Sequence, residues 1–164
     1  CTYVPTTEYP FLHPGRQAKI VKGDELIGVI GQVHPEVCDN YSFKAEAYVA
    51  IIDMPTLVEL SSFDIKYEGI AKFPAVNRDL SMVVPKNIMV GQIEEVIEKN
   101  GGAHLESYSL FDLYEGAQIK QGFKSVAYSI TFRAKDRTLS DTEISEIMDK
   151  ILAELTGLGA VLRQ

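Results

Sequence analysis

The stretch FKSVAYSITFR, residues 123–133, decides the fold of the second half of the chain. Its large apolar side chains stand at every second position: Val126, Tyr128, Ile130 and Phe132. This alternation is typical of a β-strand that buries one face. The other face then carries small or polar side chains and an arginine: Ser125, Ala127, Ser129, Thr131 and Arg133. We expect the apolar face to meet helices and the small, polar face to lie open.

The residues before this stretch predict its hairpin partner. Residues 105–114 (LESYSLFDLY) read as a strand, joined to the first through a long turn with glycines at 116 and 122. Counting every second residue places five side chains inward: Leu105, Ser107, Ser109, Phe111 and Leu113. The same count places four on the open face: Tyr108, Leu110, Asp112 and Tyr114.

A strand or a helix is predicted on each side of this hairpin. Residues 78–84 alternate as a strand, and residues 90–97 carry apolar side chains at helical spacing before Asn100-Gly101-Gly102 stops them. A second helix begins at Ser140, which forms a capping box with Glu143, and residues 160–163 suit a short edge strand. The order β-α-β-β-α-β predicts an α+β, ferredoxin-like fold: an antiparallel sheet with two helices on one face.

A flat ligand would fit the predicted open face. Small side chains beside two tyrosines leave room for a nucleobase to stack on a ring and to reach a carboxylate. The same pattern also fits an ordinary solvated sheet face, or a face that another domain covers. The residue pattern alone leaves these alternatives open.

The first half of the chain predicts a small, partial β-rich segment. Residues 17–21 and 26–33 form a hairpin, a helical turn follows His34-Pro35, residues 45–53 read as a buried strand, and residues 54–60 as a short helix. This set is too small for an independent core, so we expect a sheet whose other strands lie elsewhere. We place the domains at residues 1–62 and 63–164, and expect a fragment of a longer protein.

Composition restricts the classes of protein to consider. No apolar run reaches the roughly 20 residues that span a bilayer, so no membrane partner is expected. Two distant cysteines suggest neither a disulfide framework nor a metal site. The net charge of −7 argues against a general nucleic-acid binder, and we expect no DNA partner. Basic residues instead concentrate within residues 118–138. The sequence predicts a soluble, cytoplasmic protein.

Several motifs resemble, in order, the ferredoxin-fold anticodon-binding domain of phenylalanyl-tRNA synthetases. They are FPAVNRDLS (73–81), FDLYEG (111–116), KSVAYS (124–129), DRTLSD (136–141) and LR (162–163). In the first half, HPGR (13–16) and GVIGQVHP (28–35) resemble the end of the inactive, synthetase-like core module of the bacterial β subunit. One position departs from the family: Asn77 stands where another arginine is common, which weakens a phosphate contact there.

The resemblance implies a role in binding phenylalanine tRNA. It implies an α2β2 heterotetramer in which the α subunit attaches phenylalanine to its tRNA with ATP and Mg²⁺. Neither ATP nor Mg²⁺ is expected to bind within the chain itself. No catalytic or metal-binding residue is expected in it, so the chain should be non-catalytic. Tyr114 would stack on an anticodon base, and Asp112 would read the guanine expected at the first anticodon position. The full set of expected RNA-binding residues is Arg78, Tyr108, Asp112, Tyr114, Lys124, Ser125, Arg133 and Arg137.

Two other classes of protein share this topology. A ferredoxin-like regulatory module that binds an amino acid would carry a glycine-containing loop between the first strand and helix, and residues 85–89 have no glycine. A purely structural tail would lack salt-sensitive affinity for the tRNA, which a binding measurement distinguishes.

Overall fold

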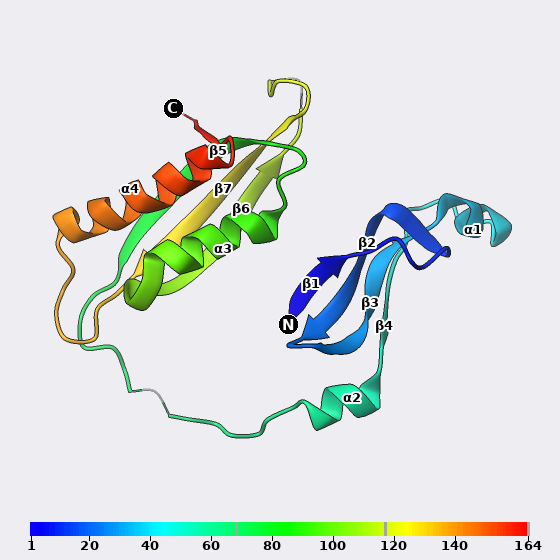
Figure 1. The fold of residues 1–164 in the computed structure, drawn as a ribbon, viewed down its shortest axis with the longest axis horizontal. Helices are drawn as coiled ribbons and strands as arrows, with labels where there is room; N and C mark the ends of the chain where they lie inside the picture. The colour runs from blue at the N-terminus through cyan, green and yellow to red at the C-terminus, as the bar shows by residue number, and fades with distance from the viewer. Residues whose placement is uncertain (68, 117, 164) are drawn as a thin grey trace. The chain divides into compact units, whose positions relative to one another are not determined.

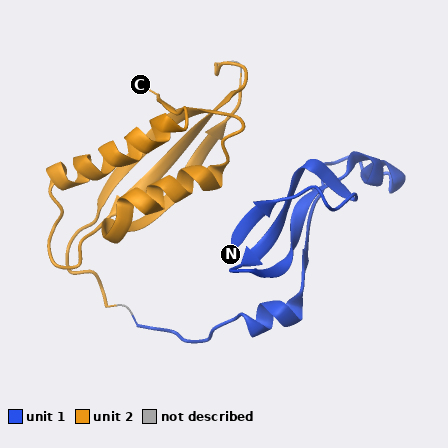
Figure 2. Ribbon diagram, in the orientation of Figure 1, with its two compact units in different colours: residues 1–67 blue, residues 68–164 orange. Residues whose placement is uncertain are grey.

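The computed structural model describes residues 1–67, 69–116 and 118–163. The chain divides into two compact units, residues 1–67 and residues 68–164 (Figure 2). We refer to them as unit 1 and unit 2. Each unit builds its own four-stranded sheet.

Unit 2 has the predicted ferredoxin-like arrangement, which confirms the fold class. Its elements are, in order, β5 (Val76–Pro85), α3 (Val90–Gly101), a short 3₁₀ turn (Gly102–His104), β6 (Leu105–Tyr114), β7 (Phe123–Phe132), α4 (Asp141–Gly157) and β8 (Val161–Leu162). The strand order is β6-β7-β5-β8, and every neighbouring pair is antiparallel. Both helices cover the same face of the sheet (Figure 1).

The core of unit 2 lies between this sheet and the two helices. The predicted inward side chains of β7 are all fully buried: Val126, Tyr128, Ile130 and Phe132. They pack with Ile93 and Ile97 of α3 and with Ile144 and Ile151 of α4. Full burial of each such side chain contributes roughly 1.5–3 kcal/mol, so this interface fixes the sheet against the helices. Among the described residues of unit 2, no helix lies over the opposite face of the sheet.

The predicted capping box fixes the start of α4. The Ser140 hydroxyl accepts a hydrogen bond from the amide of Glu143, and the Glu143 carboxylate accepts one from the amide of Ser140. Arg137 also donates to this carboxylate. The backbone hydrogen bond from Ser140, with Arg137 second, lowers the pKa of Glu143 from 4.5 to about 2. The ionised carboxylate is therefore the form that the fold stabilises.

Acid should remove this contribution to stability. Because the pKa of Glu143 is lower in the folded chain, its contribution is complete above pH 4.5 and is lost as the pH falls towards about 2. Glu143→Gln should therefore flatten the dependence of the unfolding temperature on pH within this window. Thermal unfolding by circular dichroism over a pH series measures it, with the exposed Glu146→Gln as control. A Glu143→Gln profile parallel to that of the unsubstituted chain would contradict the expectation.

Unit 1 is an antiparallel sheet with two short helices at its surface. Its elements are β1 (Thr2–Pro5), β2 (Leu12–Lys22), β3 (Glu25–Val33), α1 (Pro35–Asn40), β4 (Tyr48–Ile52) and α2 (Met54–Glu59), with strand order β1-β2-β3-β4. The hairpin, both helices and the strand at 48–52 confirm the sequence prediction. Strand β1 was missed, because four residues ending in proline carry too little alternation to indicate a strand.

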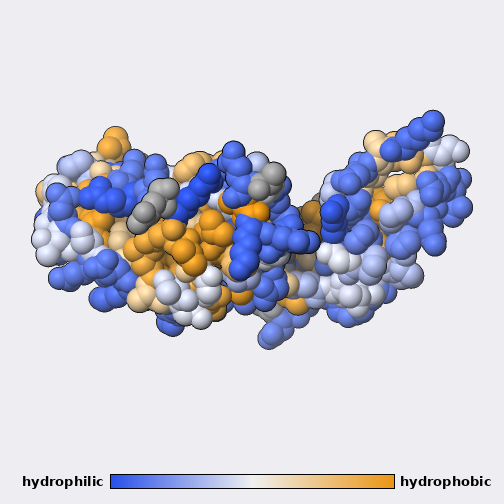
Figure 3. Space-filling model, turned by 90° about the horizontal axis from the view of Figure 1, so that it is seen from above, coloured by the Kyte–Doolittle hydropathy of each residue, from blue (hydrophilic) through white to orange (hydrophobic). Residues whose placement is uncertain are grey.

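The prediction that residues 45–53 form a buried strand is wrong. All five residues of β4 are exposed, although four of them are large and apolar. Strand β4 is an edge of the sheet and, among the described residues, pairs with β3 alone. Hydrophobic side chains reach the surface of both units in Figure 3. Within the described residues, no helix combines the length and apolarity needed to cross a membrane.

Candidate nucleic-acid interface

The open face of unit 2 follows from the register of its strands. Residues directly opposite each other on antiparallel strands point to the same side of the sheet. Because Val126, Tyr128, Ile130 and Phe132 face the helices, the alternate residues of β7 and their partners form the open face. Four rows cross it from β6 to β5: Tyr114–Ser125–Val83, Asp112–Ala127–Ser81, Ser109–Ser129–Asp79 and Ser107–Thr131–Asn77. The face is therefore mostly small and polar.

Strand β6 carries two β-bulges that change which of its side chains face outward. Glu106 is an extra residue between the pairs Leu105–Phe132 and Ser107–Thr131. Phe111 is an extra residue between the pairs Leu110–Tyr128 and Asp112–Ala127. Each bulge shifts the alternation by one residue. Between the bulges the faces are therefore the reverse of those predicted, whereas beyond Phe111 they agree with the prediction.

Tyr108 consequently does not lie on the open face, and that prediction is wrong. Its ring is 6.4 Å from the ring of the buried Tyr128, and its hydroxyl donates to Glu98 of α3 at 2.5 Å. This hydrogen bond, with burial second, raises the pKa of Tyr108 to about 12. The residue joins the sheet to α3 and is not available to a ligand on the opposite face. Leu110 likewise packs on the core.

Tyr114, Ser125 and Arg163 meet at one end of the open face. Tyr114 and Ser125 stand opposite each other on β6 and β7, and the Arg163 guanidinium donates to the Ser125 hydroxyl at 3.3 Å. The Arg163 amide donates to the Ser81 carbonyl, which extends the pairing of β8 with β5 by one residue. Ser125 is only 1% exposed under these neighbours, whereas Tyr114 is 40% exposed. An aromatic ring and a guanidinium therefore border the same small surface.

Arg163 is absent from the predicted RNA-binding residues. The sequence placed it in an edge strand but gave no indication of which side it would face. Its position depends on the register of a strand of two residues. Only that pairing brings its guanidinium across β5 to Ser125 of β7. The signal that could have placed Arg163 on the open face is the pairing of the last strand with residues 81–83.

Asp112 occupies the next row of the open face. It is exposed and stands opposite Ala127, whose methyl group leaves space above the sheet. The main-chain bond of Arg163 to Ser81 lies in the same row. A carboxylate acceptor, an aromatic ring and a cationic donor thus lie within two adjacent rows.

Three other predicted basic residues do not lie on the open face beside Tyr114. Lys124 pairs with Val84 on the helical side and is 9% exposed. Arg78 is also on that side and donates to Asp141 at 2.8 Å. Arg137, in the loop before α4, is ion-paired with Glu143 and Asp136. These positions do not favour the predicted contacts of Arg78, Lys124 and Arg137 with RNA on the sheet.

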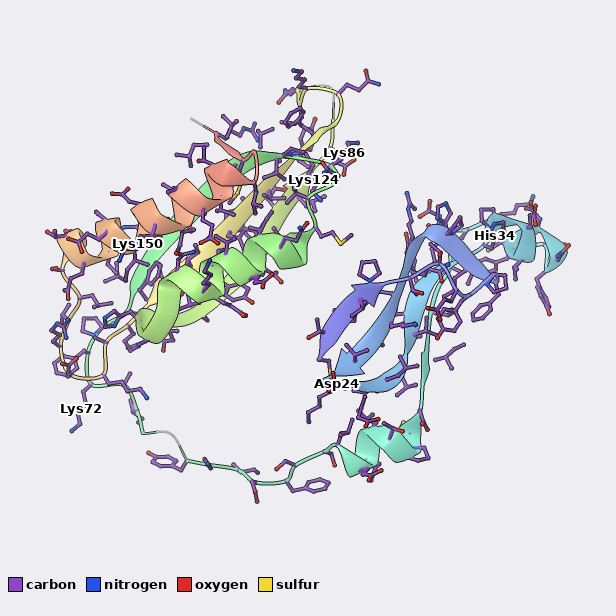
Figure 4. The ribbon with its side chains drawn as sticks, viewed as in Figure 1. Asp24, His34, Lys72, Lys86, Lys124 and Lys150 are labelled. Atoms are coloured by element: carbon purple, nitrogen blue, oxygen red, sulfur yellow. The ribbon has the colours of Figure 1, made fainter. Side chains whose placement is uncertain are left out.

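Arg133 reaches the far end of the open face but already has partners. Its guanidinium contacts the Glu106 carboxylate at 2.9 Å and donates to the Phe73 carbonyl. Lys86, in contrast, lies with Lys124 at the end of the sheet near Tyr114 (Figure 4). It is half exposed and ion-paired with Glu115. Lys86 and Arg163 thus contribute positive charge at the end of the sheet that carries Tyr114.

The fold and this face define the class of protein. Residues 71–163 match the family model described as ferredoxin-fold anticodon binding domain, and the chain belongs to this family. Residues 1–54 match the model described as phenylalanyl tRNA synthetase beta chain CLM domain. Together the two matches confirm the resemblance of both halves to the bacterial phenylalanyl-tRNA synthetase β subunit.

Curated relatives agree along nearly the whole chain. The chain is 44% identical to the phenylalanine–tRNA ligase beta subunit of Clostridium acetobutylicum and 42% identical to that of Clostridium tetani, each over 99% of its length. It is 39% identical to the beta subunit of Lactiplantibacillus plantarum, also over 99%. The chain spans only 20–21% of the length of these relatives.

Proposed function

We propose that the open face of unit 2 binds the anticodon loop of phenylalanine tRNA. The observation that carries the proposal is the gathering of Tyr114, Asp112 and Arg163 in two adjacent rows of the face that no described helix of unit 2 covers. Membership of the ferredoxin-fold anticodon binding domain family supports a role of unit 2 in binding RNA. Small side chains across the centre of the sheet let bases approach the backbone closely.

Each of the three side chains offers a different kind of contact. The exposed ring of Tyr114 provides a stacking surface for a base. The Asp112 carboxylate accepts hydrogen bonds, and guanine presents adjacent N1–H and N2–H donors that one carboxylate can bind together. Arg163 donates to Ser125 and can donate to a phosphate or base oxygen beside it. Together the three side chains bind one base of the anticodon and the RNA backbone beside it.

The remainder of the synthetase is proposed to supply the chemistry. The complete enzyme, an α2β2 assembly in this proposal, uses ATP and Mg²⁺ to attach phenylalanine to the tRNA. Within the part of the chain that the structure describes, no three His, Cys, Asp or Glu side chains lie where they could share a metal ion. The proposal places no step of that reaction on the described residues.

Asp112→Asn tests the proposed reading of guanine. The amide presents one acceptor and one donor, so it cannot accept from both guanine groups. We expect the preference of the full-length synthetase for a stem-loop with guanine over adenine at the first anticodon position to fall about 5- to 150-fold, the range of roughly 1–3 kcal/mol for one bidentate contact. Affinities for the two stem-loops measure it, with Asp79→Asn on the same face as control. An unchanged preference would show that Asp112 does not read this base.

A further inference from the structure

The ring of Tyr114 lies directly against the backbone of Gly116. A Cβ atom added at Gly116 would overlap the Oη and Cζ atoms of this ring, and would lie 2.9 Å from its Cε1 atom. Real Cβ atoms essentially never come closer than 3.0 Å to a neighbour, so the ring occupies the space that a side chain at 116 would need. Gly116 does not have a positive φ, so glycine is needed here for space rather than for its conformational freedom.

The position of Gly116 is held from both sides. Its carbonyl accepts a hydrogen bond from the amide of Ile119 at 2.9 Å. The preceding Glu115 is ion-paired with Lys86, which follows β5. Gly116 lies in the bend two residues beyond the end of β6, so the Tyr114 ring extends from the strand towards this bend. The backbone supports one side of the ring, while 40% of the residue stays exposed.

We propose that Gly116 is a positioning residue for nucleobase binding. It forms a flat support that holds the Tyr114 ring parallel to the open face and presents the other side of the ring to an anticodon base. The inference rests on the proposed function. Gly116 makes no contact with RNA in this proposal, because it acts only through the ring of Tyr114. An alanine at 116 must displace the ring, and the ring end of a tyrosine can rotate without moving the sheet. The substitution therefore changes the stacking surface while the fold stays intact.

A double-mutant cycle in the full-length synthetase tests this proposal. The affinity for the anticodon stem-loop of phenylalanine tRNA is measured for the unsubstituted enzyme, Gly116→Ala, Tyr114→Ala and the double variant. We expect Gly116→Ala alone to weaken binding at least about 5-fold, approaching the loss of one stacked base. In the Tyr114→Ala background, Gly116→Ala should change affinity by less than about twofold, because no ring remains to displace.

The matched control is Gly91→Ala, in the first turn of α3. An added Cβ at Gly91 meets nothing within 4 Å, and this variant should bind as the unsubstituted enzyme does. Thermal unfolding of every variant establishes that the fold is retained, and the double variant relieves the overlap at 116.

The outcomes distinguish RNA binding by the open face from the positioning role of Gly116. If Tyr114→Ala binds normally, the proposed function fails. If Tyr114→Ala weakens binding but Gly116→Ala does not, the proposed function stands and the positioning role is overturned. Equal losses from Gly116→Ala in both backgrounds would also overturn it, because the effect would not pass through the ring.

Discussion

Replacing Tyr114 with alanine should weaken binding of the anticodon stem-loop by the full-length synthetase about 5- to 150-fold, since stacking contributes roughly 1–3 kcal/mol per base. The ring is the large, exposed aromatic side chain that stands beside Arg163 and Ser125 on the open face. It carries no charge, so its removal releases no counterion. The slope of log K against log salt concentration should therefore stay the same.

Arg163→Gln provides the matched comparison in the same salt series. Loss of one guanidinium that meets a phosphate should flatten that slope by up to about one unit. The stacking contact of Tyr114 and the phosphate contact of Arg163 would thus be distinguished by how binding responds to salt concentration. The surface is assigned wrongly if Tyr114→Ala and Arg163→Gln both bind normally while Glu146→Lys weakens binding. Glu146 is an exposed residue of α4, on the helical face.

Phe132→Ala should lower the free energy of unfolding of unit 2 by about 3–5 kcal/mol, the usual cost of removing a buried phenylalanine. Phe132 is fully buried at the end of β7, between Val76 of β5 and Leu105 of β6. It packs in the core shared by both helices, so the cavity would lie where the sheet meets them. Urea denaturation followed by circular dichroism measures the loss.

The neighbouring Thr131 provides the control for this core substitution. It points to the open face, opposite Ser107 and Asn77. Thr131→Ala should cost less than about 1 kcal/mol, since it leaves no buried cavity. Similar losses from both substitutions would contradict the assignment of the two faces of β7.

The sequence predicted the elements of unit 2 because each one carried its own local signal. Alternation identified β5 and β7, helical spacing identified α3, and the capping box at Ser140 identified the start of α4. The burial of β4 was predicted wrongly, because an apolar run indicates that a strand can be covered but not what covers it.

The candidate site was predictable only in part. Asp112 and Tyr114 lie where counting placed them, whereas Tyr108 does not, because a β-bulge such as that at Glu106 has no signal in the sequence. The RNA contacts of the basic residues were predicted from the number and spacing of these residues in the sequence. The structure pairs Arg78 and Arg133 with nearby carboxylates, and those distances depend on the folded chain.

The two bulges of β6 compensate for each other. Glu106 shifts the phase of the strand and Phe111 restores it, so Asp112 and Tyr114 return to the side that simple alternation would give them. Because each extra residue lies between two intact pairs, deleting Glu106 or Phe111 alone would leave every pair of β6 with β7 in place and would keep both side chains on the open face. Related chains of this fold should therefore tolerate the loss of the extra residue at either bulge, because the pairs on both sides of it stay in register.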